Sequence, residues 1–401
     1  MIGHSIEGYG SILFFGLSDA LMMRNLSINY FLKAYLICIS AATILFLPSM
    51  VPGKFLTMDG DYYLQYAQLF KDGDFFSYFL YGKIPLMGVW PFGFPMLIGG
   101  VATVTGLEVF WAGRLVQLFL FFLMLWLLWK KFGQDWFFYF TLLATGIFLY
   151  NHLFTLSEAG FIVLGLAFLI AFERHQSIPA KVLVIILPLL IFSFRYVGVF
   201  VLLFLAVNVL LGYQKKLAWI SMLLLLVFVV TYFYSIYIQT GQFSGLERQG
   251  GIVSRPTMFG QFFLSTAALF SYFDIGKFQG KVGAYLFFVG TVPFIILLVS
   301  LFKEKPIREI FLDMNAFSKN AMIFGGCYLI LYLSLTLGLG WDHDGEGIIP
   351  RFLYPGFIFL ILGFFYQVTQ KVPIRNFHRQ LLLGFAITNH TYYALSGFLL
   401  N

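Results

Sequence analysis

Asp59 and Asp61 flank Gly60 immediately after the first long apolar segment of the sequence. A turn centred on the glycine would present both carboxylates to one ligand. A carboxylate placed in this way can act as a general base toward a hydroxyl group within hydrogen-bonding distance. A structural interpretation fits the same spacing: Asp59 caps a helix that begins near Asp61, and Asp61 complements the helix dipole. Spacing alone leaves both interpretations open.

A second group of polar residues precedes a late apolar segment. Asp342, His343, Asp344 and Glu346 place four oxygen or nitrogen groups close together, a pattern typical both of a cation site and of a solvated hairpin. Arg351 follows at the start of the apolar segment. Its guanidinium could bind a phosphate through two hydrogen bonds, or it could anchor the segment at a membrane interface.

Three single charges lie near the ends of other apolar segments. Arg195 lies at a tight corner between two short segments, and Arg114 and Glu158 lie near the start of longer ones. A charge that faces the interior of a helix bundle at membrane depth is a functional candidate, whereas a corner charge in water is not. We rank Glu158 and Arg195 above Arg114 as candidates.

These residues belong to a chain that is overwhelmingly apolar. Its 401 residues are 60% hydrophobic and only 11% charged, whereas soluble domains carry about 25% charged residues. This composition excludes a soluble enzyme, a disordered chain, a disulfide scaffold and a nucleic-acid-binding module. Cys38 and Cys327 both lie in apolar segments, so they indicate neither a disulfide framework nor a metal site. We therefore predict an all-α polytopic membrane protein.

The apolar segments predict about eleven transmembrane helices. The expected spans are 30–50, 110–129, 136–151, 153–172, 181–194, 196–211, 216–238, 283–302, 321–340, 353–370 and 381–398. The apolar piece 95–106 is too short to cross and contains a Gly-Gly pair, so we expect a re-entrant or surface-lying helix there. Roughly the first twenty residues are expected to form a separate cytoplasmic or interfacial helix.

The basic residues support this topology. With a cytoplasmic N-terminus and eleven spans, the net charge of +7 divides into +8 on the inside and −1 on the outside. Counting 95–106 as a span would place the pairs Lys130-Lys131 and Lys215-Lys216 outside, against the positive-inside rule.

Three long segments are therefore expected at the outer face. They are 51–109, which should contain juxtamembrane helices, 239–282, with an aromatic helix from about Met258 to Tyr272, and 341–352. The whole chain, 1–401, is expected to be one transmembrane domain without a soluble C-terminal domain. Any chemistry would take place at the outer membrane surface.

In their order along the chain, these motifs resemble those of the GT-C superfamily of integral-membrane glycosyltransferases. The likeness is to the family-39-like and aminoarabinose-transferase-like bacterial branch. The similar features are Asp59 with Tyr63 and Ala67 and then Gly73-Asp74, the aromatic segment Pro91 to Leu97, Thr155 to Glu158, Thr240-Gly241 to Gly245, and Arg351-Phe352-Leu353-Tyr354-Pro355. Together they cover about 60–370, and their order with the expected topology carries the resemblance more than any single motif.

The resemblance implies a GT-C-like fold and an inverting transfer of a sugar from a polyprenyl-phosphate donor to a hydroxyl acceptor. Asp59 would be the catalytic base, and Arg351 would hold the donor phosphate. Independently of the resemblance, Arg195 or a metal near Asp342 and Asp344 could also stabilise the departing phosphate. The family often has a second acidic residue immediately after the first. Here Gly60 takes that position and the acid is Asp61, which leaves open whether Asp61 acts in catalysis, binds a cation or shapes the loop.

The resemblance also suggests further contacts and partners. Substrate contacts are expected from Tyr62, Tyr63, Trp90, Glu158 and His343. Asp342 and Asp344 could hold Mg²⁺ or Mn²⁺, although whether any metal is required stays open. The expected partners are the lipid-linked donor, a lipid, glycan or protein acceptor, and membrane lipids, but not nucleic acid. The expected location is a bacterial inner membrane, with the site facing the periplasm or exterior.

Two other functions fit the composition. A transporter or flippase for lipid-linked saccharides would show internal repeats and helices broken at the midplane. The sequence has no evident repeat, and its polar residues collect in the outer segments. A polysaccharide polymerase or ligase would use a large outer loop with Arg and His, and the long first loop with Asp59 argues against it.

Overall fold

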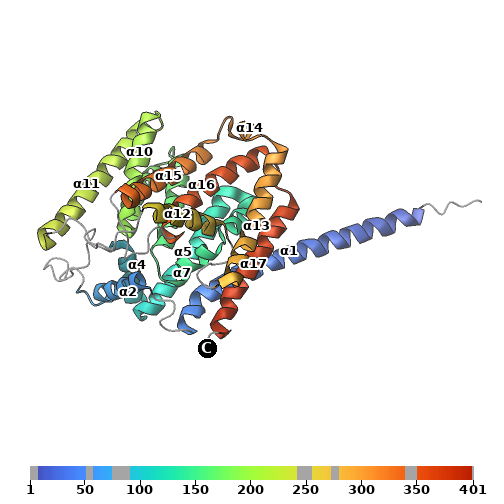
Figure 1. The fold of residues 1–401 in the computed structure, drawn as a ribbon, viewed down its shortest axis with the longest axis horizontal. Helices are drawn as coiled ribbons and strands as arrows, with labels where there is room; N and C mark the ends of the chain where they lie inside the picture. Colours follow the sequence, from blue (N-terminus) through green and yellow to red (C-terminus); the bar gives the residue numbers. More distant parts are fainter. Residues whose placement is uncertain are drawn as a thin grey trace, which may run out of the picture.

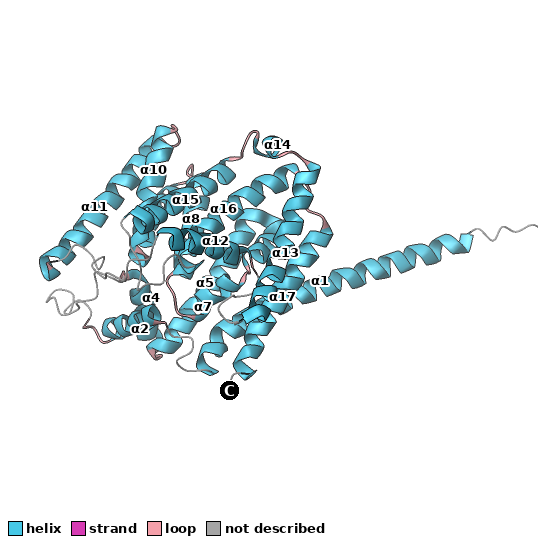
Figure 2. Cartoon of the chain, viewed as in Figure 1, coloured by secondary structure: helices cyan, strands magenta, loops and turns pink. Residues whose placement is uncertain are grey.

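A computed structural model of the chain describes residues 8–50, 57–74, 91–241, 255–271, 280–338 and 350–399, and its regular structure there is entirely helical (Figures 1 and 2). The all-α prediction is confirmed for these residues. The α-helices are α1 (Gly8–Met50), α2 (Met58–Lys71), α4 (Gly93–Thr105), α5 (Val109–Phe132), α6 (Trp136–Leu143), α7 (Gly146–Leu153), α8 (Glu158–Glu173), α9 (Ile178–Phe194), α10 (Phe200–Leu210), α11 (Lys215–Thr240), α12 (Arg255–Phe270), α13 (Gly280–Glu304), α14 (Ile307–Phe311), α15 (Ala316–Leu333), α16 (Pro350–Lys371) and α17 (Asn376–Leu399). Short 3₁₀ turns, η1 (Gly133–Asp135) and η2 (Tyr196–Val199), join some of them.

Several helices are long and apolar enough to cross a membrane. Within the described ranges there are five, or six if the bent pair of α7 and α8 forms one span. The five are Asn29–Met50, Val109–Leu143, Lys215–Ile238, Ala316–Thr336 and Arg351–Lys371. The structure therefore supports a membrane protein, and the count of eleven spans stays a prediction.

The N-terminal helix differs from the expectation. Residues 8–50 form one continuous α1, not a short helix followed by a separate span, and its N-terminal part extends away from the other helices (Figure 1). No proline interrupts α1 before Pro48, so Asp19 and Arg24 end the apolar run without ending the helix. By contrast, α4 covers only 13 residues, as expected for the short apolar piece, and α12 matches the predicted aromatic helix closely.

The predicted span 136–151 is divided into two helices. α6 ends at Leu143, and α7 starts after Thr145, whose backbone is extended. The side chain of Tyr354 in α16 donates a hydrogen bond to the backbone oxygen of Leu143 at 2.9 Å. The same carbonyl also accepts a hydrogen bond from the backbone N–H of Thr145 at 2.7 Å. The tertiary bond therefore connects α16 to the break, which local sequence could not reveal.

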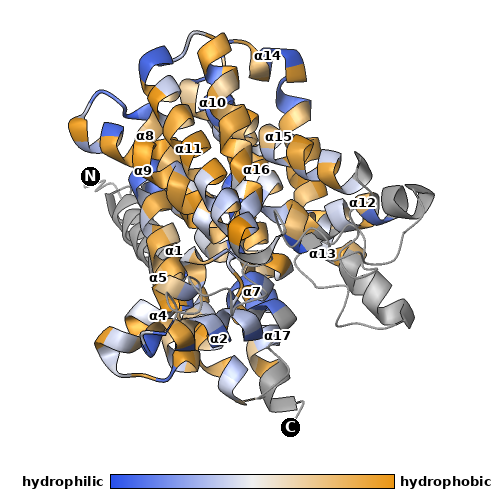
Figure 3. Cartoon of the chain, turned by 90° about the vertical axis from the view of Figure 1, so that its left-hand side faces the viewer, coloured by the Kyte–Doolittle hydropathy of each residue, from blue (hydrophilic) through white to orange (hydrophobic). Residues whose placement is uncertain are grey.

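Charged residues gather at the two ends of the helical body. Figure 3 shows hydrophilic positions around α14 at one end and around α2 and α7 at the other, with hydrophobic helices between them. Every ion pair among the described residues joins two residues that the charge pattern assigns to the same face of the membrane. The pairs are Lys131–Glu173, Arg375–Glu304 and Arg379–Asp135 on the predicted inner face, and Arg195–Glu158, Arg351–Asp59 and Arg351–Glu158 on the predicted outer face.

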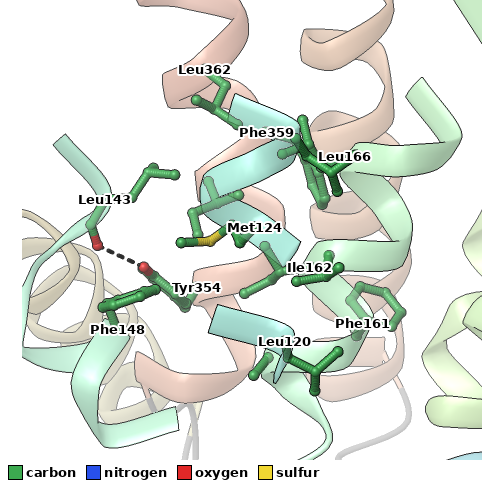
Figure 4. Packing of buried hydrophobic residues seen from close by; sticks show 14 of the residues in the cluster. Leu120, Met124, Leu143, Phe148, Phe161, Ile162, Leu166, Tyr354, Phe359 and Leu362 are labelled. Atoms are coloured by element: carbon green, nitrogen blue, oxygen red, sulfur yellow. Dashed lines mark hydrogen bonds between the residues drawn. The ribbon is translucent and has the colours of Figure 1, made fainter. Parts of the chain in front are cut away.

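Figure 4 shows the part of the core where α5, α8 and α16 meet the α6–α7 break. Its labelled members are Leu120, Met124, Leu143, Phe148, Phe161, Ile162, Leu166, Tyr354, Phe359 and Leu362. α16 also packs closely against α15, since a Cβ added at Gly325 would lie only 2.5 Å from the backbone oxygen of Gly356. Small residues at such contacts let helix backbones approach in membrane proteins. This packing fixes the start of α16, and with it Arg351.

Candidate functional site

The position of Asp59 follows from how α2 begins. The side chain of Thr57 caps the helix and accepts a hydrogen bond from the backbone N–H of Gly60 at 3.0 Å. Asp59 is therefore the second residue of α2, and the interpretation of Asp59 as the cap is wrong. The predicted turn centred on Gly60 is also wrong, because Gly60 lies within the first helical turn.

Asp59 pairs with Arg351 across the fold. Nη2 of Arg351 donates to Oδ2 of Asp59 at 2.7 Å, and the two side chains are 12% and 17% exposed respectively. Arg351 is the second residue of α16, close to the positive end of the helix dipole. A cation is disfavoured there, so the neighbouring carboxylates stabilise Arg351 in this position.

Glu158 connects Arg351 to a second arginine. It is the first residue of α8, its side chain is buried, and it forms an ion pair with Arg195 while lying 4.0 Å from Nε of Arg351. Arg195 is the C-cap residue of α9, at the predicted corner before η2. Asp59, Glu158, Arg195 and Arg351 thus form one charged cluster built from four separate parts of the chain.

The ring of Phe352 lies beside both arginines of the charged cluster. Its centroid is 5.2 Å from the guanidinium carbon of Arg195 and 4.6 Å from that of Arg351. A ring face attracts a cation at this distance. Two acids therefore balance two arginines around one aromatic ring, and an incoming anion could bind the arginines if it displaced a carboxylate.

Tyr63 is buried against the charged cluster. Its hydroxyl shares a hydrogen bond with the Ser157 hydroxyl at 3.0 Å, and its ring meets Phe94 edge to face. Burial raises the pKa of Tyr63, and the negative charge of Asp59 raises this pKa further. The phenol consequently stays protonated at neutral pH and cannot serve as a base, so its visible role is to join α2 to the start of α8.

Other predicted site residues lie apart from these contacts. Asp61 accepts a hydrogen bond from Gln65 at 2.8 Å along the exposed side of α2. Because residues two apart on a helix point in different directions, Asp59 and Asp61 do not face one ligand. Tyr62 is partly exposed on the same helix. Trp90 and His343 lie outside the described residues.

The predicted metal ligands also lie outside the described residues. They are Asp342 and Asp344, so the metal site stays a prediction. Where the structure describes the chain, no three His, Cys, Asp or Glu side chains lie close enough together to hold a metal ion.

No site role was predicted for three neighbours of the charged cluster, although Phe352 and Ser157 lie within motifs that carry the family resemblance. Phe352 has a visible signal, since it directly follows Arg351. Ser157 gives only a weak signal as the residue before Glu158. Tyr328, which donates to the backbone oxygen of Phe352 at 2.6 Å, lies inside an apolar helix and has none.

Comparisons with protein-family models, with curated proteins and with solved structures find no match to this chain.

Proposed function

We propose that this protein is a membrane-embedded glycosyltransferase of GT-C type. It would move a sugar from a polyprenyl-phosphate donor to a hydroxyl acceptor at the outer face of a bacterial inner membrane. The observation that carries the proposal is the pairing of Asp59 with Arg351 beside Glu158 and Arg195. The predicted base, the two predicted phosphate ligands and Glu158, a predicted substrate contact, are thus joined by ion pairs, which supports the proposal.

The chemistry needs a base and a phosphate ligand side by side. The acceptor oxygen attacks the anomeric carbon while the bond from that carbon to the phosphate oxygen breaks, which inverts the configuration. Asp59 takes the acceptor proton. The polyprenyl phosphate leaves with an added negative charge, which Arg351 and Arg195 stabilise.

The observed ion pair also suggests how the donor prepares the base. Oδ2 of Asp59 accepts a hydrogen bond from Arg351. A donor phosphate that accepts the hydrogen bond from Arg351 in place of Asp59 would leave Oδ2 of Asp59 able to accept a hydrogen bond from the acceptor hydroxyl. Glu158 would keep Arg195 in place throughout, because it lies deeper than Asp59 and is almost fully buried.

A lipid-linked saccharide transporter is the second candidate. The bend of 112° between α7 and α8 favours it, since transporters often place binding sites at broken helices. The charged cluster, however, lies at one end of the helical body with α2, and a base beside phosphate ligands is not required for transport alone.

A transfer assay separates the two functions. The purified protein would be placed in lipid nanodiscs with a panel of polyprenyl-phosphate monosaccharides and mixed lipid and glycan acceptors. We expect release of free polyprenyl phosphate and a glycosylated acceptor from at least one donor. Movement of an intact fluorescent lipid-linked saccharide across liposomes without transfer would instead support the transporter.

A further inference from the structure

The segment between α7 and α8, residues 154–157, forms a sharp break next to the charged cluster. The two helices meet at 112°, and Thr155 has a φ of +53°. A β-branched residue in this conformation is strained and persists only where its surroundings hold it. Glu158 follows the break directly, so the position of its carboxylate depends on how the break is held.

Two buried side chains of α5 hold the backbone of this break. Arg114 donates through Nη1 to the backbone oxygen of Leu153 at 2.6 Å and lies 3.5 Å from that of His152. Gln117 donates through Nε2 to the backbone oxygen of Leu156 at 2.9 Å. The last carbonyls of a helix lack helical partners, and Arg114 satisfies that of Leu153 at the end of α7. Gln117, one turn further along α5, bonds to a carbonyl within the break itself.

The contact between α5 and the break is close. A Cβ added at Gly113 would lie 3.3 Å from Cγ2 of Thr155 and 3.4 Å from Cδ2 of Leu64 in α2. From the other side, Tyr63 bonds to Ser157. The strained segment is therefore clamped between α5 and α2.

In the described part of the chain, the hydrogen bonds of Arg114 go to backbone carbonyl groups and not to side chains. The side chain is fully buried, and within the described residues its Nε and Nη2 make no hydrogen bond. Its bonds go to carbonyls at the C-terminus of α7, where a cation complements the helix dipole. Gln117 is also fully buried, and its hydrogen bond likewise goes to the backbone of the break.

We propose that Arg114 and Gln117 are positioning residues that fix the 154–157 break and thereby hold Glu158 in its ion pair with Arg195 and beside Arg351. The effect on donor binding rests on the proposed function. The effect on the break does not, so the two can be tested separately.

The first test measures hydrogen–deuterium exchange of peptides covering residues 152–160. Gln117→Leu and Arg114→Met should speed exchange there about tenfold, the effect of losing one or two buried hydrogen bonds. The matched control is Gln367→Leu, because Gln367 is also buried and donates to a backbone carbonyl near the end of a helix, that of Ile310 in α14, at 2.8 Å. The control should change exchange near Ile310 and leave 152–160 unaffected.

The second test measures binding of undecaprenyl phosphate to the protein in nanodiscs. Arg114→Met should weaken binding about five- to tenfold, and the loss should not add to that of Glu158→Gln, because Arg114 acts through Glu158. Arg114→Lys, which keeps a donor, should recover part of the affinity.

Unchanged exchange at 152–160, or equally faster exchange throughout α15 and α16, would overturn the positioning role, and so would additive losses of affinity. If exchange rises locally while the wild-type protein binds no undecaprenyl phosphate, the positioning of the break is supported and the proposed function fails.

Discussion

Asp59 and Arg351 are 292 positions apart in the sequence, and their side chains are joined by a hydrogen bond of 2.7 Å. The pair connects α2, which follows the first span, to the start of α16 near the other end of the chain. While they are paired, Oδ2 of Asp59 and Nη2 of Arg351 are each engaged in this hydrogen bond. A ligand that binds one of them changes the environment of the other.

Replacing Arg351 by Ala should weaken binding of undecaprenyl phosphate about 10- to 100-fold, because a charge-assisted hydrogen bond to the phosphate is lost. Arg351→Lys should recover little of this, since an ammonium cannot reproduce the planar, two-pronged contact. Binding can be measured by native mass spectrometry. Arg379→Ala is the matched control, because Arg379 also pairs with an aspartate, Asp135 at 2.8 Å, at the other end of the molecule. Equal affinity in Arg351→Ala and wild type would refute the phosphate-binding role.

Glu158→Gln should lower stability more than Asp59→Asn does. The Glu158 side chain is 1% exposed, whereas that of Asp59 is 17% exposed. Breaking a buried pair leaves Arg195 without its charge partner, which typically costs about 3–5 kcal/mol, and the more exposed pair is better screened by solvent. Chemical unfolding of the purified protein in detergent gives both values. The reverse order of stability would contradict the arrangement described for the charged cluster.

Tyr63→Phe should leave the pH dependence of transfer unchanged between about pH 6 and 9. Burial raises the pKa of Tyr63, so the phenol is protonated throughout this range. The contribution of Tyr63 to stability should be lost only above about pH 10, where a phenol of the unfolded chain ionises. Because the chain has 23 tyrosines, Tyr63→Phe should reduce the alkaline loss of stability without abolishing it. A shift of the pH–rate profile below pH 9 would mean that Tyr63 takes part in proton transfer.

Lys130→Cys and Asp72→Cys should be labelled by a membrane-impermeant maleimide from opposite sides. Both positions are exposed, and the charge pattern assigns Lys130 to the cytoplasm and Asp72 to the outside. The background should carry Cys38→Ser, since Cys38 is exposed. Labelling of both cysteines in intact cells would rule out the predicted topology.

The members of the charged cluster were visible in the sequence because each is a charge at the end of an apolar segment. Helices that cross the same layer bring their ends to the same level, so Asp59, Glu158, Arg195 and Arg351 could be assigned to one face. Which of them touch depends on helix packing, such as the close contact of α15 with α16 at Gly325. No local pattern encodes that packing, and for the same reason Tyr328 gave no signal.

One error of the sequence analysis has a local cause and the other a distant one. Thr57 starts α2 earlier than the acidic pair suggested, which turns Asp61 toward Gln65 and away from Asp59. The break after Leu143 is held by Tyr354, a residue more than 200 positions later. Hydropathy measures only whether a stretch is apolar, so it cannot place a break that a distant hydrogen bond stabilises.

The most direct test of Asp59 as the base compares Asp59→Asn with wild type in a single-turnover transfer reaction and in binding of undecaprenyl phosphate. We expect the transfer rate to fall by about 10²–10⁴, the contribution of a positioned general base. Phosphate affinity should be at least as high as in wild type, because the amide competes less for Arg351. Transfer at a near wild-type rate by a folded Asp59→Asn variant would contradict the mechanism.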